Sequence, residues 1–252
     1  MYKKQMKISI ITVCYNSVDT LVKTIQSVAN QTYNNIEYIV VDGNSKDDTL
    51  AIIKQYETII TKWVSEPDNG LYDAMNKGVA MATGDLIGIL NSDDTFFSNQ
   101  VLEEIAEFHH KSDIDASVGN IIQINSQGKV VRKYSAANWN PKKLKIGFMP
   151  PHPAIFFKRE LFEKFGMYHL DFVIGADYEL IIRFFLKHHI TWKYSGITTT
   201  TMLVGGLSSS GLKSYQLISK EIGKALTRNN IKYSSLKIKL RGFWKVLGLL
   251  RK

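Results

Sequence analysis

Two adjacent carboxylates, Asp93 and Asp94, follow an apolar run at 86–90, with Asn91 just ahead of them. Like charges side by side repel, and burial raises the cost of ionising either one, so such a pair needs solvent, a cation or hydrogen-bond donors around it. One explanation is helix capping by Asp94 or Ser98. The other is a divalent cation, Mg2+ or Mn2+, which takes few protein oxygens and completes its coordination with phosphate oxygens and water.

A third carboxylate, Asp42, ends a β-branched run and is followed by Gly43, Asn44 and Ser45. Its side chain either closes an Asx-turn, as expected in a turn of this composition, or accepts a hydrogen bond from a nucleobase ring N–H. The first apolar run of the chain is followed by neither a Walker lysine motif nor a G-x-G-x-x-G motif. The usual sequence support for an ATPase or a dinucleotide-binding Rossmann protein is therefore missing.

These side chains lie at the ends of predicted strands. Short β-branched runs alternate with segments whose apolar residues recur at helical spacing, and this alternation predicts right-handed βαβ units and a parallel, doubly wound sheet. Ligands bind such sheets beyond the carboxyl ends of the strands, which is where the polar residues at 15–16, 42, 68–69 and 91–94 fall. The predicted strands are 8–14, 36–41, 62–64 and 86–90, and the predicted helices start near 19, 48 and 71.

The alternation changes near residue 115. Two β-type runs flank Asn125-Ser126-Gln127-Gly128 and predict a hairpin, and two further strands follow, so we expect a mixed sheet attached to the first half. The runs are 116–124, 129–134, 154–157 and 198–204. We predict one domain over 1–212, with a nucleotide-binding half at 7–114 and an acceptor half at 115–212, and a helical region over 213–252.

Composition limits the possible classes of protein. The chain has 252 residues, 44% of them hydrophobic, which is enough for a sizeable core. The single cysteine, Cys14, excludes an intrachain disulfide, no apolar run is long enough to cross a bilayer, and residues 1–4 lead into a strand instead of a signal peptide. We therefore expect a cytoplasmic protein. The net charge of +9 fits nucleic acid, an anionic membrane or a phosphate-bearing substrate, and no acidic residue follows Glu221.

The last segment, 234–252, has an amphipathic helical pattern. A helix packed on the domain with a solvated basic edge would show this pattern. A helix in the interface of an anionic bilayer is favoured by the lack of acidic residues, the Trp-Phe pair on the apolar face and a length too short to span. We therefore predict peripheral attachment to the inner face of the cytoplasmic membrane. The apolar face holds Leu236, Leu240, Phe243, Trp244, Val246, Leu247 and Leu250, and the opposite flank holds Lys237, Arg241, Lys245 and Lys252.

Several longer motifs occur in a fixed order along the chain. They are ISIITVCYN at 8–16, VDGNSKDDT at 41–49, NGLYDAMNKGVAMATGDLIGILNSDD at 69–94, PHPAIFFKRELFEKFG at 151–166 and GADYELIIRF at 175–184. Together they resemble the family 2 glycosyltransferases of the GT-A fold, which are inverting and use nucleotide-sugar donors. The motif at 151–166 resembles the bacterial surface-polysaccharide branch of that family. The resemblance covers most of residues 7–210.

The resemblance implies a donor site and a cation site. The family's D-x-D metal motif maps onto Asn91-Ser92-Asp93, so the implied ligands of Mg2+ or Mn2+ are Asp93 and Asp94. Two positions depart from the family pattern: Asn91 carries no charge, and Gly43 stands where the family often has a second carboxylate. The implied donor-nucleotide residues are Thr12, Val13, Tyr15, Asn16, Asp42, Asn69, Asn76, Lys77, Asn91 and Ser92.

The resemblance also implies a general base. The matching residue is Asp177, at the start of a predicted helix, where the helix dipole favours a carboxylate. The alternative explanation of Asp177 is a plain N-cap, and Glu179 is a local competitor whose side chain points elsewhere on a helix. We favour Asp177 as the base. His152, between two prolines, is either a structural loop residue or a contact to acceptor or phosphate. Gly205 and Gly206 belong to a segment that closes over the donor in the family.

We therefore expect an inverting hexosyltransferase type of enzyme, with a UDP-sugar favoured as donor. The expected acceptor is a glycan or a polyprenyl-diphosphate-linked sugar, and no nucleic acid partner is expected. A sugar-phosphate nucleotidyltransferase is the enzymatic alternative, although its Gly-rich N-terminal signature with Arg and Lys is absent. A nucleotide-binding or membrane-docking module without catalysis is the other alternative. The presence of Asp177 argues against it.

Overall fold

The protein is described here by a computed structural model that covers residues 5–204 and 212–241. These residues form two compact units. Unit 1 comprises the described parts of 1–137, 150–168 and 191–204, and unit 2 those of 138–149, 169–190 and 205–252. This division differs from the predicted one, because the C-terminal helices share a unit with the segment that carries Asp177.

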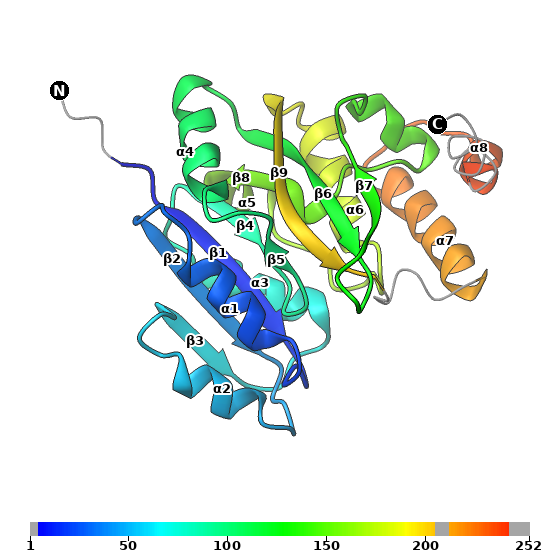
Figure 1. Ribbon diagram of the computed structural model, residues 1–252. Coiled ribbons are helices and arrows are strands. Elements are labelled where there is room, and N and C mark those ends of the chain that lie inside the picture. Colours follow the sequence, from blue (N-terminus) through cyan, green and yellow to red (C-terminus); the bar gives the residue numbers. More distant parts are fainter. Residues whose placement is uncertain (1–4, 205–211, 242–252) are drawn as a thin grey trace. The chain divides into compact units, whose positions relative to one another are not determined.

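Within the described residues, nine strands of unit 1 form one sheet (Figure 1). They are β1 (Ile8–Cys14), β2 (Ile36–Asp42), β3 (Lys62–Ser65), β4 (Leu86–Ile89), β5 (Thr95–Phe96), β6 (Ala116–Ile124), β7 (Val130–Tyr134), β8 (Ile155–Lys158) and β9 (Trp192–Leu203). The order is β3-β2-β1-β4-β8-β6-β9-β5, and β7 pairs with β6. The first four strands are parallel, whereas β8 is antiparallel to both of its neighbours. The parallel first half and mixed second half are as predicted.

Helices cover both faces of this sheet, because its central strands are apolar on both sides. Every residue of β1 is buried. Ile8 and Ile10 share a core with residues of α1 and α4, whereas Ile11 points to the opposite face, where α3 packs. A Cβ at Gly78 would lie 2.3 Å from Ile11 Cγ2, so glycine permits this close approach. The helices are α1 (Leu21–Ala29), α2 (Thr49–Gln55), α3 (Leu71–Met81), α4 (Val101–Lys111), α5 (Glu160–Phe165) and the 3-10 turn η2 (His152–Ala154).

The second half of the sheet confirms the predicted hairpin and extends one predicted strand. β6 and β7 pair antiparallel around residues 125–128. β9 starts at Trp192, six residues before the expected start at 198. Its first part was missed because Gly196 interrupts the β-type run, and the structure accommodates this glycine with a φ of +76° and a register shift against β6.

Unit 2 is helical. α6 packs on α7, and the buried residues Ile222, Ala225 and Leu226 of α7 recur at helical spacing. The rings of Trp139 and Phe185 meet edge to face at 5.3 Å. The elements are η1 (Pro141–Ile146), α6 (Ala176–Ile182), a π-helical turn η3 (Arg183–Lys187), α7 (Leu212–Arg228) and α8 (Ser235–Lys239).

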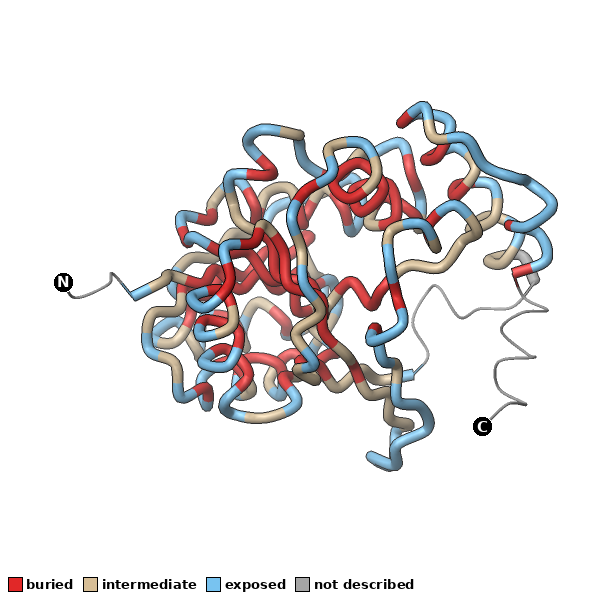
Figure 2. Tube along the Cα trace, turned by 90° about the horizontal axis from the view of Figure 1, so that it is seen from above, coloured by how far each residue is buried: buried red, intermediate tan, exposed pale blue. Residues whose placement is uncertain are grey.

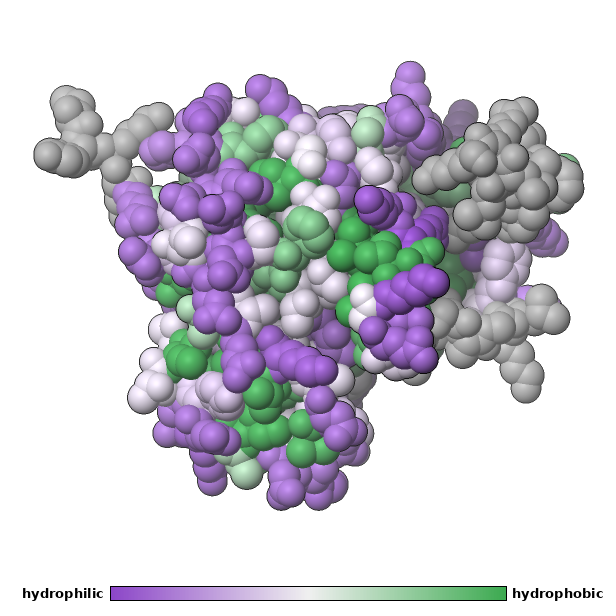
Figure 3. Space-filling model, viewed as in Figure 1, coloured by the Kyte–Doolittle hydropathy of each residue, from purple (hydrophilic) through white to green (hydrophobic). Residues whose placement is uncertain are grey.

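Burial follows the strands. Figure 2 shows buried residues gathered along the central strands, and Figure 3 shows a face on which hydrophilic residues separate small groups of hydrophobic ones. Among the described helices, none combines the length and the apolar character that a membrane crossing requires.

Candidate active site

The loops after β1, β2 and β4 meet at one edge of unit 1. These strands are parallel neighbours, and Cys14 at the end of β1 pairs in register with Asp42 at the end of β2. Ser17 Oγ lies 2.9 Å from Ser92 Oγ, which joins the first loop to the loop after β4. Most of the polar residues predicted for this edge therefore lie close together, as expected for a parallel sheet.

A side chain of helix α1 holds the turn at 91–94 in place. Thr24 is fully buried, and its hydroxyl lies 2.9 Å from the carbonyl oxygen of Ser92 and 2.8 Å from that of Asp94. The backbone N–H of Asp94 donates to the carbonyl of Asn91 at 3.0 Å. The backbone of the turn is therefore satisfied by the protein itself, which leaves the side chains of Asn91, Asp93 and Asp94 for another task.

Asp94 and Asn91 carry buried oxygens without hydrogen bonds. Asp94 is 1% exposed, and both of its carboxylate oxygens and Asn91 Oδ1 have no partner among the described residues. The helix-capping explanation is wrong for Asp94, because α4 begins after Gln100 with no side-chain cap. Buried polar atoms of folded proteins nearly always have a partner, so three unpartnered oxygens at one turn are suited to binding a cation or a hydrogen-bond donor.

The electrostatics of Asp94 point the same way. Burial, and then the charge of Asp93, raise the pKa of Asp94 well above its ordinary value, and a backbone contact at Leu203 offsets this only in part. Asp93 itself is exposed. In the described parts of the chain there is no group of three or more His, Cys, Asp or Glu side chains placed to hold a metal. These residues fit a Mg2+- or Mn2+-type cation that draws its other ligands from phosphate and water.

Asp42 is engaged by its own loop. It is fully buried, and its carboxylate accepts hydrogen bonds from the Ser45 N–H at 3.1 Å, from the Ser45 hydroxyl, and from the Ser65 hydroxyl at 2.6 Å. These hydrogen bonds fit the Asx-turn explanation of Asp42. Asn16 adds to the same loop, because its N–H donates to Ser45 Oγ at 2.8 Å and its Oδ1 accepts from the Lys46 N–H at 2.8 Å.

A different carboxylate faces the open part of this edge. A Cβ at Gly43 would lie 2.5 Å from Asp68 Oδ2 and 3.4 Å from Tyr15 Cδ2, so these three residues are neighbours. Tyr15 is 61% exposed. Asp68 is half-buried, and its other oxygen accepts from the Gly70 N–H at 2.8 Å. The sequence places Asp68 at this edge but assigns it no role, because only the fold shows that Gly43 makes room for its carboxylate.

Two predicted donor-binding residues are inside the sheet. Thr12 is fully buried and accepts from the Tyr38 hydroxyl at 3.1 Å. Val13 is 4% exposed. The structure does not bring these two side chains to the edge.

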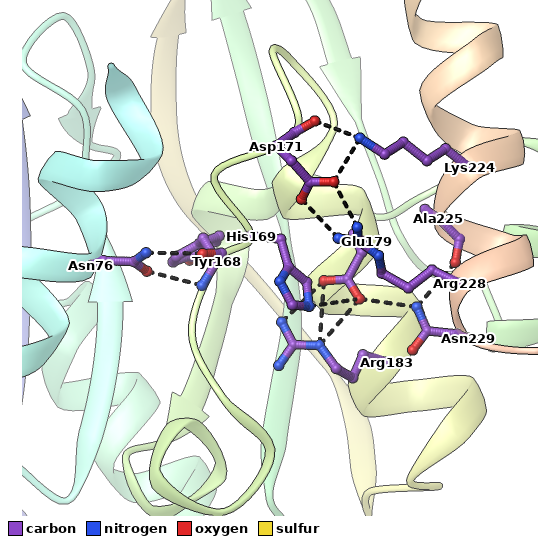
Figure 4. Close-up of polar contacts among 10 residues, drawn as sticks. All are labelled: Asn76, Tyr168, His169, Asp171, Glu179, Arg183, Lys224, Ala225, Arg228 and Asn229. Carbon is purple, nitrogen blue, oxygen red and sulfur yellow. Dashed lines mark hydrogen bonds and ion pairs between the residues drawn. The ribbon is translucent and has the colours of Figure 1, made fainter. Parts of the chain in front are cut away.

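Three other predicted donor-binding residues lie on α3 or just before it, and each is hydrogen-bonded to another residue of unit 1. Asn76 bonds to the backbone of Tyr168 with its amide N–H and its oxygen, both at 2.9 Å (Figure 4). Lys77 donates to the carbonyl of Pro67 at 2.8 Å and pairs with Glu66 at 2.9 Å. Asn69 is exposed, and its backbone N–H donates to the Asp73 carboxylate at 2.9 Å.

His152 is a buried structural residue of unit 1. Its Nε2 lies 2.9 Å from the Tyr168 hydroxyl, and the two rings meet edge to face. Burial lowers the pKa of His152 to about 4, so the imidazole is neutral near pH 7. A neutral, buried ring favours the structural explanation over a charged contact to phosphate. The two glycines predicted to close over the donor, Gly205 and Gly206, lie outside the described residues.

Asp177 stands in the first turn of α6 in unit 2. The N-cap is Gly175, so the capping explanation of Asp177 is wrong. Asp177 is half-buried, and its Oδ1 accepts from the Tyr178 N–H at 2.7 Å. Its competitor Glu179 is fully buried and bonded to Arg183 at 3.0 Å and to Asn229 at 2.9 Å, as Figure 4 shows. A carboxylate fixed in this way is not available as a base.

Comparison with known proteins decides the family. The model of Glycosyl transferase family 2 matches residues 9–170, which include every residue of the edge described above. The chain belongs to this family. Family 2 membership makes it a glycosyltransferase and removes the sugar-phosphate nucleotidyltransferase alternative.

Curated relatives are named as glycosyltransferases. An uncharacterized glycosyltransferase of Mycobacterium tuberculosis is 38% identical over 179 residues, which cover 70% of this chain and 68% of that protein. The PGL/p-HBAD biosynthesis glycosyltransferase of Mycobacterium bovis BCG is 29% identical over 229 residues, which cover 86% and 83%.

Solved structures agree on the fold. S. aureus TarS 1–349 in complex with UDP-GlcNAc superposes with a TM-score of 0.69 at 18% identity, over 92% of this chain and 69% of that one. This family 2 chain therefore has the predicted GT-A-type α/β architecture.

Proposed function

We propose that this family 2 enzyme transfers a sugar, with inversion, from a nucleotide-sugar donor to a glycan or polyprenyl-diphosphate-linked acceptor in bacterial surface-polysaccharide synthesis. The observation that carries the proposal is the buried, unpartnered carboxylate of Asp94 beside the exposed Asp93 at the carboxyl end of β4. Support for donor and pathway comes from a TarS complex that contains UDP-GlcNAc and from a relative named for PGL/p-HBAD biosynthesis.

The proposed reaction uses the carboxylates of Asp93, Asp94 and Asp177. Asp93 and Asp94 would hold a divalent cation, which would supply positive charge to the donor diphosphate. Asp177 accepts the proton of the acceptor hydroxyl. The acceptor oxygen then attacks the anomeric carbon, the bond from that carbon to the diphosphate oxygen breaks, and the nucleoside diphosphate leaves from the opposite face. The anomeric configuration is thereby inverted.

In this proposal, Asp68 and Tyr15 recognise the nucleobase of the donor. Asp42 already accepts hydrogen bonds from Ser45 and Ser65, whereas one oxygen of Asp68 is directed toward Gly43 and the exposed Tyr15 ring. The ring offers a stacking surface for the base, and the carboxylate accepts from a ring N–H such as that of uracil. Gly43, at the position where the family often has a second carboxylate, leaves space for this arrangement.

The test of the donor site is calorimetric titration of UDP, with Mn2+ present, into the wild type, Asp68→Asn and Asp42→Asn. Asp68→Asn should weaken UDP binding by about 10- to 100-fold, because a hydrogen bond to a charged acceptor is worth roughly 1.5–3 kcal/mol. Asp42→Asn should keep UDP affinity within a few-fold and instead lower the unfolding temperature. A panel of UDP-, GDP- and dTDP-sugars, followed by nucleoside diphosphate release, then identifies the donor.

The reverse pattern would return base recognition to Asp42. If Asp42→Asn weakens UDP binding and Asp68→Asn does not, the assignment of Asp68 is wrong. If the wild type binds neither UDP nor any nucleotide sugar of the panel, the proposed donor site as a whole is wrong.

We also propose that the C-terminal region attaches the enzyme to the inner face of the cytoplasmic membrane. Leu236 of α8 is 63% exposed and Leu240, the C-cap of this helix, is 45% exposed, so two leucines of the predicted apolar face lie on the surface. Arg241, expected on the solvated basic flank, is instead 2% exposed, and its guanidinium lies over the Tyr215 ring and donates to Ser219 at 2.9 Å. The rest of the predicted amphipathic helix, from Phe243 on, lies outside the described residues.

The double variant Leu236→Gln/Leu240→Gln should lose binding to phosphatidylglycerol vesicles by at least about tenfold. The reason is that burying a leucine in the interface contributes roughly 1.5–3 kcal/mol. Co-sedimentation measures the binding, and transfer to a water-soluble acceptor should stay unchanged.

The matched control removes apolar surface elsewhere. Val130→Thr/Val131→Thr alters two exposed residues of β7 in unit 1 and should leave vesicle binding unaltered. Equal binding by the leucine variant and the wild type would contradict membrane attachment through α8.

A further inference from the structure

A buried carboxylate of α7 binds the backbone just ahead of the proposed base. Glu221 is 6% exposed. Its Oε1 accepts from the Val173 N–H at 2.7 Å, and its Oε2 accepts from the Ile174 and Gly175 N–H groups at 3.0 and 2.8 Å. Three consecutive amides thus converge on one side chain, two residues before Asp177.

This arrangement determines how the chain enters α6. Binding three successive N–H groups to one carboxylate fixes the backbone dihedrals between them, because the groups converge on one point only in a narrow range of conformations. Gly175 lies close against Glu221, since a Cβ there would lie 3.1 Å from Glu221 Oε2 and 3.2 Å from Glu221 Cβ. The direction in which Asp177 leaves the first turn follows from this entry.

Two further contacts, from α7 and from Asn229 just after it, lie on either side of Asp177 in the sequence. Asp171 receives both guanidinium nitrogens of Arg228 at 2.8 and 2.6 Å and the ammonium of Lys224 at 2.7 Å (Figure 4). Glu179, two residues after Asp177, accepts from Asn229. The segment 171–179 is therefore bonded to α7 at Asp171 and, through Glu221, at residues 173–175, and to Asn229 at Glu179.

Ordinary helix capping does not require such a device. A Ser, Thr, Asp or Asn at the N-cap satisfies a helix start from within the same segment. Here the N-cap is Gly175, which has no side chain to contribute, and the acceptor comes from a residue 46 positions later in the chain. A remote buried carboxylate does what a local cap does not, because it ties the position of the first turn to a second helix.

We propose that Glu221 is a positioning residue for sugar transfer: it holds residues 173–175 so that the Asp177 carboxylate is directed at the acceptor hydroxyl. This inference rests on the proposed role of Asp177 as the base. It also assigns a task to α7, which the sequence placed in a separate C-terminal region. Glu221 is not expected to contact donor or acceptor.

The test variant is Glu221→Gln, which keeps the shape of the side chain but replaces one of its two accepting oxygens with a donor. We expect kcat to fall by about 10- to 100-fold, the range that a misplacement near 1 Å produces. The affinity for UDP, measured by calorimetry with Mn2+, should stay within twofold, because the donor site belongs to unit 1. Transfer is followed as UDP release with a short-chain polyprenyl diphosphate monosaccharide as acceptor.

Glu107→Gln serves as the matched control. It removes an exposed carboxylate that is paired with Lys111 on α4, and kcat should not change. Gly175→Ala is a second variant for the case that Glu221→Gln does not fold. Its Cβ would push against Glu221, and it should lower kcat by a smaller factor, again without loss of UDP binding.

A double-mutant cycle separates positioning from general damage. If Glu221 acts through Asp177, adding Glu221→Gln to Asp177→Asn should cause no further loss of the residual rate. An equal further loss, a parallel loss of UDP affinity, or an unchanged kcat in Glu221→Gln and Gly175→Ala would each overturn the inference. Full activity of Asp177→Asn alone would instead show that the proposed base is wrong.

Discussion

Replacing Asp177 with asparagine should lower the rate of transfer by about 100-fold or more, because an amide cannot take the proton of the acceptor hydroxyl. Donor affinity should not change, since the residues proposed to bind the donor belong to unit 1 and Asp177 to unit 2. The fold should also survive. The side-chain amide of the variant still offers an oxygen to the Tyr178 N–H, which Asp177 binds at 2.7 Å.

The measurement pairs UDP binding by calorimetry with the rate of UDP release in the presence of acceptor. Glu160→Gln is the control, because Glu160 is likewise a carboxylate in the first turn of a helix, α5, and is exposed. It should retain full activity. A loss of less than about tenfold in Asp177→Asn would assign the proton transfer to another group.

The early strands and the edge they form were predictable because their physics is local. β1 is a β-branched run buried on both faces, and such a run is typical of a central parallel strand. Once the strands are parallel, their carboxyl ends must share one edge, so the proximity of Ser17 and Ser92 follows without coordinates.

The roles of individual side chains at that edge were not predictable, because each depends on partners from other elements. Asp42 is occupied by Ser65, which belongs to β3. Asn76 looked free to bind a ligand from its place in the motif, but it is bonded to Tyr168, 92 residues later. Pairings over such distances follow from the packing of elements and leave no periodic pattern in the sequence.

The C-terminal region shows the same limit. A helical wheel placed Arg241 with the solvated lysines, yet it is buried against Tyr215 of α7. The wheel reports which residues share a face and says nothing of which face meets the protein. The contacts of Glu221 and Arg228 with the segment around Asp177 likewise depend on how α7 packs. From the sequence alone, α7 was therefore predicted to belong to a separate C-terminal region.

The second large effect is expected from Asp94→Asn, which should lower transfer by about 100-fold or more and yet stabilise the cation-free protein. Burial and the charge of Asp93 raise the pKa of Asp94 well above its ordinary value. Between the unfolded-state pKa, near 3.9, and this raised value, the native state holds a proton that the unfolded state has lost. The free energy of unfolding therefore falls as pH rises through that window. Asparagine does not ionise, so the variant is spared this loss.

Cation binding should reverse the order of stability of the wild type and Asp94→Asn. Mn2+ binds the ionised carboxylate, so the wild type should gain unfolding temperature with added Mn2+, by the mass-action stabilisation of a ligand that binds only the native state. Its affinity for Mn2+ should rise with pH until Asp94 is fully ionised, with proton release below that point. Asp94→Asn should show neither effect.

Thermal unfolding in EDTA and in Mn2+, at pH 5 and pH 7, measures both proteins without recourse to activity. Asp19→Asn, which removes an exposed carboxylate just before α1, should behave as the wild type throughout. Equal stabilisation of Asp94→Asn and the wild type by Mn2+, or full wild-type transfer in EDTA, would contradict the cation site. The stability gained by Asp94→Asn in EDTA would then mean only that a strained buried acid had been removed. If the cation site is confirmed, the same gain equals the stability that the wild type loses by keeping an unpartnered carboxylate where the donor diphosphate and its cation bind.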